Sequence, residues 1–411
     1  MPVSRERTLL VPTLDDAPLP GILFTAFEPS GDDHASKVIA RVRSLRPDIP
    51  IYAWGGPKMA RAGAQIIERT GDDAVMGMPG LAKIRQHVQI NDRISSWLQH
   101  TPVAIHVPVD SPAANFPICA ITRKAHLGIV HLVAPQIWAW ARWRIHKLRR
   151  LTDCVLCVLP FEEHFFRKRD VPAHFIGHML FDEPIDHAAL DIAAQALPVG
   201  SPRIALMPGS RPAELARNFP MLLDMVRALR TDFPTLQGVI ACTRPEVETD
   251  LRRAASEWAT QVGEPISPSN WPMNLASVVG QTDTVIHWSD MALVKSGTVT
   301  LQVAKHRKPM VIFYRKGSKT SYVLARSFIP TKFFTLPNLI AGERIVPEFV
   351  PHFGGPEPII AAAKELLSNP AARAAQIDSL NRICSMFAGL DASHLAAEKI
   401  IEHYNLRVHR A

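Results

Sequence analysis

Short apolar runs alternate with longer amphipathic stretches along most of the chain. The runs have the length and apolar content of buried strands, and most of the intervals between them have room for a helix. Strands that alternate with helices in this way are typical of a parallel sheet with crossover helices, so the pattern predicts an α/β fold. The predicted strands are Gly21–Phe27, Ile51–Trp54, Val103–Val109, Gly128–Val133, Asp153–Leu159, Arg203–Met207, Gly238–Ala241, Thr284–Trp288 and Pro309–Tyr314.

A break in this pattern falls at Glu183–Pro202, where proline and glycine residues cluster before a new strand begins at Arg203. The chain has 411 residues, and a single core stops growing at roughly 250–300 residues. We therefore predict two doubly wound domains that face each other across a cleft, with ligands beyond the carboxyl ends of the strands. The predicted units are an extension over residues 1–20, Rossmann-like domains over 21–185 and 186–385, and a helical segment over 386–411 that packs back on the first domain.

The composition excludes a generally disordered chain, since 47% of the residues are apolar and 20% are charged. A formal net charge of +8 suggests an anionic partner, and leaves nucleic acid, phosphate-bearing small molecules and anionic lipid open. No run approaches the ~18–20 apolar residues that span a bilayer, and Met1–Pro20 carries charges where a signal peptide needs an apolar core. We expect a cytosolic protein or one that sits on a membrane face.

Metal and redox chemistry are disfavoured by the sequence. Five cysteines are too few and too scattered for a disulfide framework, which indicates a reducing compartment. Cys154 and Cys157 form a C-x-x-C pair inside a predicted strand, where residues three apart point to opposite faces. No Asp-x-Asp occurs, and no His/Cys/Asp cluster has the spacing of metal ligands. Any phosphate would therefore have to be met by backbone amides and by Arg or Lys.

The predicted strand Arg203–Met207 leads into a loop that suits a diphosphate. Gly209 allows a tight turn, the amides from Ser210 onward can point at an anion, and Arg211 offers a fork of donors that matches phosphate. An ordinary strand-to-helix turn with a solvated arginine is the equally weighted alternative.

A second loop of the same kind precedes a predicted helix. Ser296 or Thr298 can cap this helix, and Gly297 allows a ligand to approach the backbone. Gln302 lies one turn further along the same helix face, where it can bond a sugar hydroxyl. A simple capped helix is the slightly favoured interpretation when this loop is considered alone, but two such loops in one domain strengthen each other.

The first half carries two further candidates at strand ends. Ser30, Gly31 and Asp32 form a small turn whose amides and carboxylate are predicted to face the cleft. Asp110 follows the strand Val103–Val109, where a carboxylate can act as a general base on an acceptor hydroxyl. Both segments can also be simple helix caps.

Aromatic and basic side chains interleave in the segment Pro135–Arg150. Trp138, Trp140 and Trp143 stand among five Arg and Lys residues, a mixture that suits a membrane interface or stacked nucleobases. The commonest outcome for such a run is an amphipathic helix with a buried tryptophan and a solvated basic face.

Taken together, these segments resemble the lipid A disaccharide synthase family of inverting glycosyltransferases. The resemblance covers roughly Gly21 to Ala397, and its motifs follow the family's order. The matching segments are Glu28–His34, Gly55–Met59 with Gly63, Asp110–Pro112 with Asn115, Ala134–Trp140, Leu159–Glu162, Gly177–His178, Met207–Glu214, Ser296–Thr298 with Thr300 and Leu301, and Leu336–Leu339.

The resemblance implies a GT-B fold with an N-terminal acceptor domain and a C-terminal UDP-binding domain. It implies transfer of 2,3-diacylglucosamine from UDP to 2,3-diacylglucosamine 1-phosphate, which yields a β-1,6 disaccharide and UDP with neither metal nor cofactor. It also implies a cytoplasmic protein on the inner face of the cytoplasmic membrane, with the segment Met76–Ile90 and the tryptophan-rich stretch near lipid. Nucleic acid is not an expected partner, and the sequence leaves the oligomeric state open, a homodimer included.

The same resemblance assigns roles to individual residues. Asp110 is the implied general base, and Arg211 the implied contact to the diphosphate or the transition state. The implied contacts to the UDP-sugar are made by Ser30, Gly31, Gly209, Ser210, Ser296, Gly297, Thr298, Gln302 and Asn338.

Two departures from the family pattern concern these roles. The family typically reads Asp-x-Pro-Asp-Phe-Asn, whereas this chain has Ala113 and Ala114 in place of the second Asp and the Phe. The Glu that the family places on the ribose hydroxyls is Gln302, which can still bond them but without charge assistance. The alternatives are a divergent UDP-sugar enzyme with another acceptor and a non-catalytic UDP-sugar-binding or lipid-binding paralogue.

Overall fold

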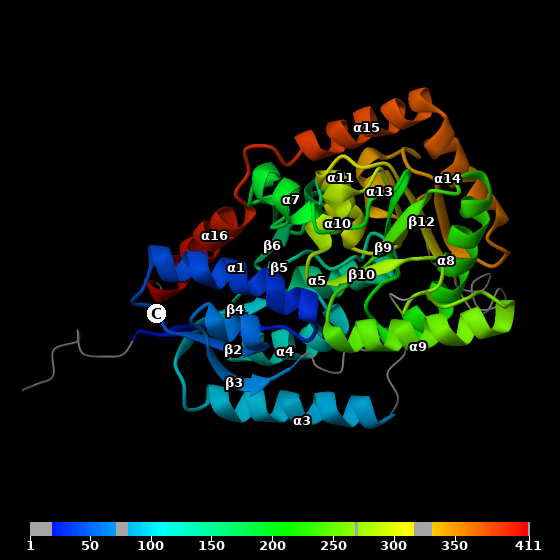
Figure 1. Cartoon of the computed structure of the whole chain (residues 1–411). Helices are drawn as coiled ribbons and strands as arrows, with labels where there is room; N and C mark the ends of the chain where they lie inside the picture. Colours follow the sequence, from blue (N-terminus) through cyan, green and yellow to red (C-terminus); the bar gives the residue numbers. More distant parts are fainter. Residues whose placement is uncertain (1–18, 71–80, 268–269, 316–330, 410–411) are drawn as a thin grey trace, which may run out of the picture.

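The chain folds around two parallel β-sheets, each covered by helices on both faces, as the computed structural model shows (Figure 1). The structure describes residues 19–70, 81–267, 270–315 and 331–409. Within them, the first sheet has seven strands in the order β3-β2-β1-β4-β5-β6-β7, and the second has six in the order β10-β9-β8-β11-β12-β13. Both contain the 3-2-1-4-5 order of doubly wound dinucleotide-binding folds, which confirms the predicted fold class.

The first sheet and its helices come from the N-terminal part of the chain. Its elements are β1 Gly21–Thr25, α1 Pro29–Leu45, β2 Ile51–Gly55, α2 Pro57–Arg61, β3 Gln65–Arg69, α3 Leu81–Leu98, β4 Val103–Pro108, α4 Pro112–Lys124, β5 Gly128–Leu132, the 3₁₀ turn η2 Arg142–Arg144, α5 Ile145–Leu151, β6 Cys154–Cys157, α6 Glu162–Arg167 and β7 Ala173–Phe175. The next helix, α7 His187–Ala194, packs against α10 Thr282–Trp288 of the second half.

The second sheet begins after α7, and its helices continue to the C-terminus. Its elements are β8 Arg203–Met207, α8 Pro212–Asp232, β9 Gln237–Cys242, α9 Pro245–Val262, β10 Ala276–Val279, α10 Thr282–Trp288, β11 Met291–Lys295, α11 Val299–Lys305, β12 Met310–Arg315, α13 Leu336–Ala341, β13 Glu348–His352, α14 Glu357–Ser368, α15 Pro370–Ser385 and α16 Ala392–Val408.

One predicted strand is wrong. Thr284–Trp288 lies in the helix α10, and the strand of this unit is β11, which follows it. The residues Thr284, Val285 and Trp288 are buried at helical spacing, and a short apolar run cannot be assigned to strand or helix by periodicity alone. The other eight predicted strands overlap observed ones, whereas β3, β7, β10, β11 and β13 were not predicted.

The segment Met76–Ile90, which the resemblance places near lipid, is described only in part. Residues 76–80 lie outside the described residues, as do residues 1–18 of the N-terminal extension, and Leu81–Ile90 belong to the helix α3. None of the helices described here is both long and apolar enough to cross a bilayer.

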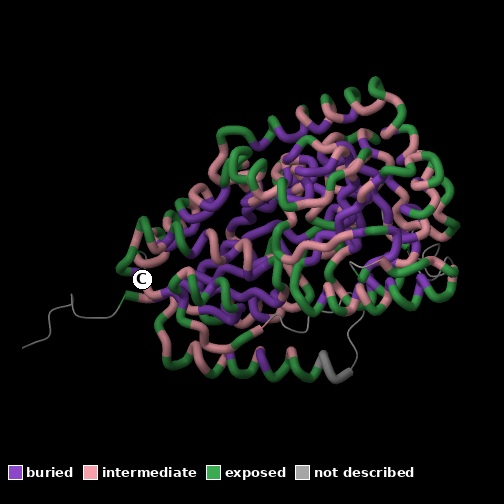
Figure 2. The backbone as a smooth tube through the Cα atoms, viewed as in Figure 1, coloured by how far each residue is buried: buried purple, intermediate pink, exposed green. Residues whose placement is uncertain are grey.

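The core is continuous between the two sheets. In β8, Ile204 and Leu206 face a cluster beneath α8, α9 and α14, whereas Ala205 and Met207 face the opposite side. This second side joins one large apolar cluster that includes side chains of α1, α16 and α11. Figure 2 shows buried segments, in purple, running through both halves of the molecule. Burial on both faces is what a parallel sheet requires, and the shared cluster ties the two sheets together.

The C-terminal helices connect the two halves. α15 contacts α11, α13 and α14, whereas α16 contacts α1, β4 and β5 of the first sheet (Figure 1). Between these helices, the ring of Phe387 stacks on Phe181 with a centroid distance of 4.4 Å. The end of the chain therefore reaches back from the second sheet to the first.

Candidate active site

The strand orders show where a ligand site is expected. In a doubly wound sheet, ligands bind beyond the carboxyl ends of the strands where the strand order reverses. These points lie between β1 and β4 in the first sheet and between β8 and β11 in the second. The loops that follow these four strands carry Glu28, Asp110, Arg211 and Ser296.

Asp110 is held in an unusual backbone conformation directly after β4. Asp110 and Ser111 have φ values of 44° and 37°, in the left-handed region that residues other than glycine rarely adopt. The buried Asn115 stabilises this turn, because its Nδ2 donates to the carbonyl oxygens of Val109 and Asp110, both at 2.9 Å. The Asn115 Oδ1 in turn accepts from Thr25 Oγ1 at 2.7 Å. The position of the Asp110 backbone is thus fixed by buried hydrogen bonds.

The electrostatic surroundings of Asp110 disfavour its charged form. Burial of the carboxyl and the negative charge of Glu28 raise the pKa of Asp110 from 3.8 to about 6. Glu28 Oε1 accepts a hydrogen bond from Ser111 Oγ at 2.9 Å, which places this second carboxylate beside the Asp110 turn. A carboxylate with a pKa near 6 is ionised at neutral pH and is basic enough to accept a proton.

A third carboxyl group of this region is that of Glu162, at the start of α6. It is 1% exposed, and its oxygens accept from Trp138 Nε1 at 2.9 Å and from the amides of Val158 and Leu159. Burial raises the pKa of Glu162 to about 7, and the Asp110 charge acts in the same direction. These bonds anchor the segment that contains the buried Trp138.

The turn after β1 only partly matches the prediction. Ser30 is exposed in the first turn of α1, and Gly31 is buried against Ala26. The Asp32 carboxylate was predicted to face the cleft, but it accepts hydrogen bonds from the amides of Gly56, Lys58 and Met59 at 3.0–3.1 Å. Asp32 therefore caps the neighbouring helix α2.

Arg211 connects the second sheet to the first. Its Nη2 lies 3.4 Å from Glu28 Oε2, and its Nη1 lies 3.5 Å from Glu214 Oε1. The preceding Gly209 has a φ of 105°, and Ser210 is exposed. The left-handed turn at Gly209 brings the guanidinium to the place where loops of the two sheets meet.

A buried ion pair supports this loop. Lys295 Nζ, at the end of β11, lies 2.7 Å from Glu214 Oε2, and both side chains are about one-tenth exposed. Burial lowers the pKa of Lys295, an effect that its bond to Glu214 opposes. A Cβ on Gly209 would lie 3.3 Å from Lys295 Cδ, so the turn and the ion pair pack closely. Neither Lys295 nor Glu214 was predicted as a site residue.

The loop after β11 presents its backbone to solvent. Gly297 and Thr298 are exposed, and Thr298 occupies the N-cap position of α11 without a capping hydrogen bond from its side chain. Thr300 Oγ1 instead donates to the Gly297 carbonyl at 2.7 Å. The side-chain cap expected from Ser296 or Thr298 is therefore absent here, and this loop lies beside the Gly209 loop because β11 pairs with β8.

Gln302 and Asn338 use their amides in different ways. Gln302 Nε2 donates to Asp283 Oδ1 in α10 at 2.9 Å. Asn338 is fully buried, and its amide makes hydrogen bonds to backbone groups of Ile345 and Val346, all at 2.9 Å. Asn338 thus holds the turn that leads into β13.

Glu28 is the main site residue to which the sequence analysis assigned no role. It was part of a quoted motif, but its contact to Arg211 joins residues 183 positions apart. The position of Glu28 directly after β1, beside the strand that precedes Asp110, is the signal that could have identified it.

Comparison with known proteins identifies the family. The model of the family described as lipid-A-disaccharide synthetase matches residues 22–388. The chain belongs to this family. The lipid-A-disaccharide synthase of Anaeromyxobacter sp. (strain K) is 34% identical over 385 residues, which cover 92% of this chain and 96% of that protein.

Solved structures with the same fold are more distant in sequence. The glycotransferase of kitacinnamycin has a TM-score of 0.61 at 14% identity and covers 94% of this chain and 100% of its own. An S. aureus MnaA-UDP co-structure has a TM-score of 0.59 at 11% identity. The match covers 95% of this chain and 97% of the MnaA chain. The fold is GT-B, and the family makes this chain a glycosyltransferase of lipid A biosynthesis with lipid-A-disaccharide synthase function.

Proposed function

We propose that this family member transfers 2,3-diacylglucosamine from UDP to the 6-hydroxyl of 2,3-diacylglucosamine 1-phosphate, with Asp110 as the general base. Asp110 takes the hydroxyl proton while the oxygen attacks the anomeric carbon, and the bond from that carbon to UDP breaks with inversion. The observation that carries this proposal is the convergence of Asp110, with its raised pKa, and Arg211 at the meeting point of the two sheets.

The departing diphosphate needs positive charge on the side of the second sheet. Arg211 supplies a planar fork of donors, and the backbone of Gly209–Ser210 and Gly297–Thr298 supplies amides beside it. The Ser296 amide instead donates to the Phe313 carbonyl at 2.9 Å. The UDP named in the S. aureus MnaA co-structure supports a UDP site in this fold. We propose that these groups, with Lys295 behind them, stabilise the leaving UDP without a metal ion or a separate cofactor.

The first sheet offers less to the sugar than was expected. Ser30 is exposed at the start of α1 and can contact a polar substrate, whereas Gly31 is buried and contributes through its close packing. In the second half, Asn338 acts indirectly, since the hydrogen bonds of its amide hold the turn before β13. Ala113 is exposed and provides no carboxylate, but Glu28 places a carboxylate on the same turn.

We also propose that the protein works at the inner face of the cytoplasmic membrane, because both substrates carry acyl chains. Trp140 and Trp143 are 50% and 63% exposed, and the Arg144 guanidinium lies 4.5 Å from the centre of the Trp140 ring. Exposed tryptophans beside arginines suit an interface with anionic lipid. Sedimentation with anionic vesicles should fall when both tryptophans are replaced by serine, and unchanged sedimentation would contradict this surface.

The reaction is tested by a product assay in detergent micelles with a chelator present. The substrates are UDP-2,3-diacylglucosamine and 2,3-diacylglucosamine 1-phosphate, and soluble UDP-N-acetylglucosamine serves as the comparison donor. We expect a disaccharide and UDP from the acylated pair only. Turnover of the soluble donor without an acyl acceptor would support another UDP-sugar enzyme, and UDP binding without any product would support a non-catalytic paralogue.

A further inference from the structure

Asp283, in the first turn of α10, lies against Gln302 of α11 and the following His306. Its Oδ1 is 2.9 Å from Gln302 Nε2 and 2.7 Å from His306 Nε2. The His306 side chain is 1% exposed, whereas that of Asp283 is 54% exposed. The buried His306 ring therefore fixes one oxygen of the Asp283 carboxylate, while the side chain remains partly open to solvent.

These contacts determine how the Gln302 amide is oriented. Only the NH₂ group can face a carboxylate oxygen, so Gln302 Oε1 points away from Asp283 Oδ1. Within the part of the chain that the structure describes, neither Gln302 Oε1 nor Asp283 Oδ2 has a hydrogen-bond partner. The pair thus presents two acceptor oxygens, one of them charged.

The pair lies close to the proposed diphosphate loops. Gln302 is in the helix that begins directly after Ser296–Thr298, one turn along the chain. In a nucleoside diphosphate the ribose is joined to the phosphates through its 5′ carbon, so the sugar lies next to them. Its 2′ and 3′ hydroxyls are adjacent donors that are best matched by two adjacent acceptors, and a charged acceptor forms the stronger bond.

We propose that Asp283 accepts a hydrogen bond from a ribose hydroxyl of the nucleotide, with Gln302 orienting the carboxylate and accepting from the neighbouring hydroxyl. The inference rests on the proposed UDP site. In this role Asp283, on α10, supplies the negative charge that the Gln302 side chain lacks. The hydrogen bond from His306 also lowers the pKa of Asp283 and keeps the carboxylate ionised at neutral pH.

The test measures the affinities of UDP and of its 2′-deoxy and 3′-deoxy forms by calorimetry. We expect the wild type to bind at least one deoxy form about tenfold more weakly than UDP, and Asp283→Asn to lose most of this discrimination. The double variant Asp283→Asn with Gln302→Glu returns one carboxylate to the pair and should restore it. This second variant separates loss of the charge from a disturbed fold.

Asp191→Asn is the matched control, because Asp191 also bonds a histidine, His287 at 2.7 Å, but has no contact to Gln302. It should discriminate as the wild type does. Equal discrimination by Asp283→Asn and the wild type would overturn this inference and leave the proposed function intact. Failure of the wild type to bind UDP would overturn the proposed function together with the inference.

Discussion

The proposed chemistry depends on how single residues are held at the end of β4. The Asn115 amide bonds the carbonyl oxygens on both sides of the left-handed turn, so the Asp110 carboxyl is presented from a rigid backbone. Glu28 contributes a second charge to the same turn and contacts Arg211 from the other sheet. A base whose pKa lies near the working pH combines sufficient ionisation with sufficient proton affinity.

The raised pKa of Asp110 predicts how activity depends on pH. Its carboxyl is neutral below a pKa of about 6, so kcat/KM should rise as pH increases through about 6 and level off above it. Glu28→Gln removes the negative neighbour and should move this midpoint to lower pH. Initial rates across the pH range measure the midpoint in the wild type and in Glu28→Gln. The control is Glu398→Gln, which changes a distant, exposed carboxylate. An identical midpoint in Glu28→Gln and the wild type would contradict the coupling.

The sequence was informative about some of these residues and silent about others. Asp110 and Arg211 follow strands that were predicted and are observed, so strand prediction placed them at the carboxyl edge of their sheets, whereas Ser296–Thr298 follow β11, which was not predicted. The Glu28–Arg211 contact joins the ends of two loops and the Gln302–Asp283 bond joins two helices, and no local pattern encodes either contact. Asp32 looked like a site residue because its carboxylate is equally suited to a ligand and to the amides of a neighbouring helix.

At the scale of elements, three of the five described strands that were missed share a physical cause. β3, β10 and β13 contain partly exposed or polar positions, such as Glu68, Ser277 and His352, which break up the apolar run. β11 was obscured by the apolar residues of α10 that precede it. Central strands such as β1 and β5 are buried at every residue and were correctly predicted.

The helix α2 depends on a cap from another element. Asp32→Ala would leave the amides of Gly56, Lys58 and Met59 without their acceptor, and should lower the free energy of unfolding by about 1–2 kcal/mol. Urea denaturation measures this change. The neighbouring Asp33→Ala removes only an exposed ion pair with Lys58 and should cost less than about 1 kcal/mol. Equal losses in the two variants would contradict the capping role.

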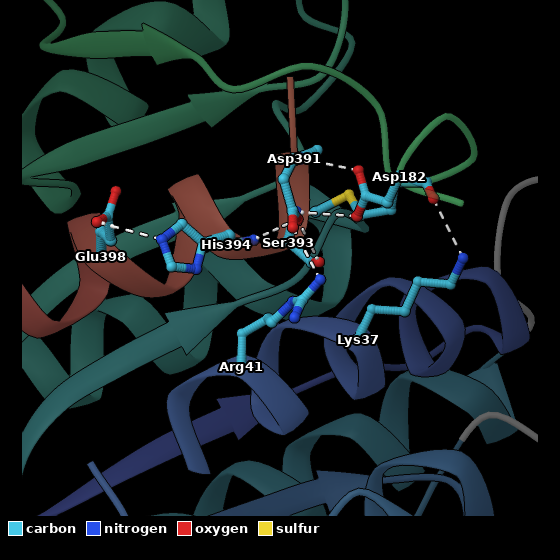
Figure 3. A network of polar contacts seen from close by, with 9 residues as sticks. Lys37, Arg41, Asp182, Asp391, Ser393, His394 and Glu398 are labelled. Atoms are coloured by element: carbon cyan, nitrogen blue, oxygen red, sulfur yellow. Dashed lines mark hydrogen bonds and ion pairs between the residues drawn. The ribbon is translucent and has the colours of Figure 1, made fainter. Parts of the chain in front are cut away.

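At the scale of the whole molecule, the segment after β7 ties the two halves together. Lys37 of α1 donates to the Met179 carbonyl at 3.1 Å, and Lys305 of α11 donates to the Leu180 and Glu183 carbonyls at 2.8 and 2.7 Å. The Asp182 carboxylate accepts from the first amides of α16, beside the ion pair of Arg41 and Asp391 (Figure 3). One short segment thus contacts both sheets and the last helix.

Loss of the Asp182 carboxylate should therefore loosen α16 from the first half. Asp182→Ala removes the acceptor for the amides of Ala392 and Ser393, at 2.8 and 3.0 Å, and should cost about 1–2 kcal/mol. Hydrogen exchange in the first turn of α16 should accelerate. Glu398→Ala, which breaks an exposed pair with His394 on the same helix, should leave that exchange unchanged. Wild-type protection in Asp182→Ala would show that Asp391 alone caps the helix.

The most direct test is the initial rate of disaccharide formation from the two acylated substrates by the wild type and by Asp110→Asn. Asparagine retains the shape of the side chain but cannot accept the proton. We predict that the rate falls by about 10²–10⁴-fold, while UDP affinity stays within about twofold because the phosphate contacts lie on the second sheet. A variant that retains a rate within about tenfold of the wild type would contradict the assignment of Asp110 as the base.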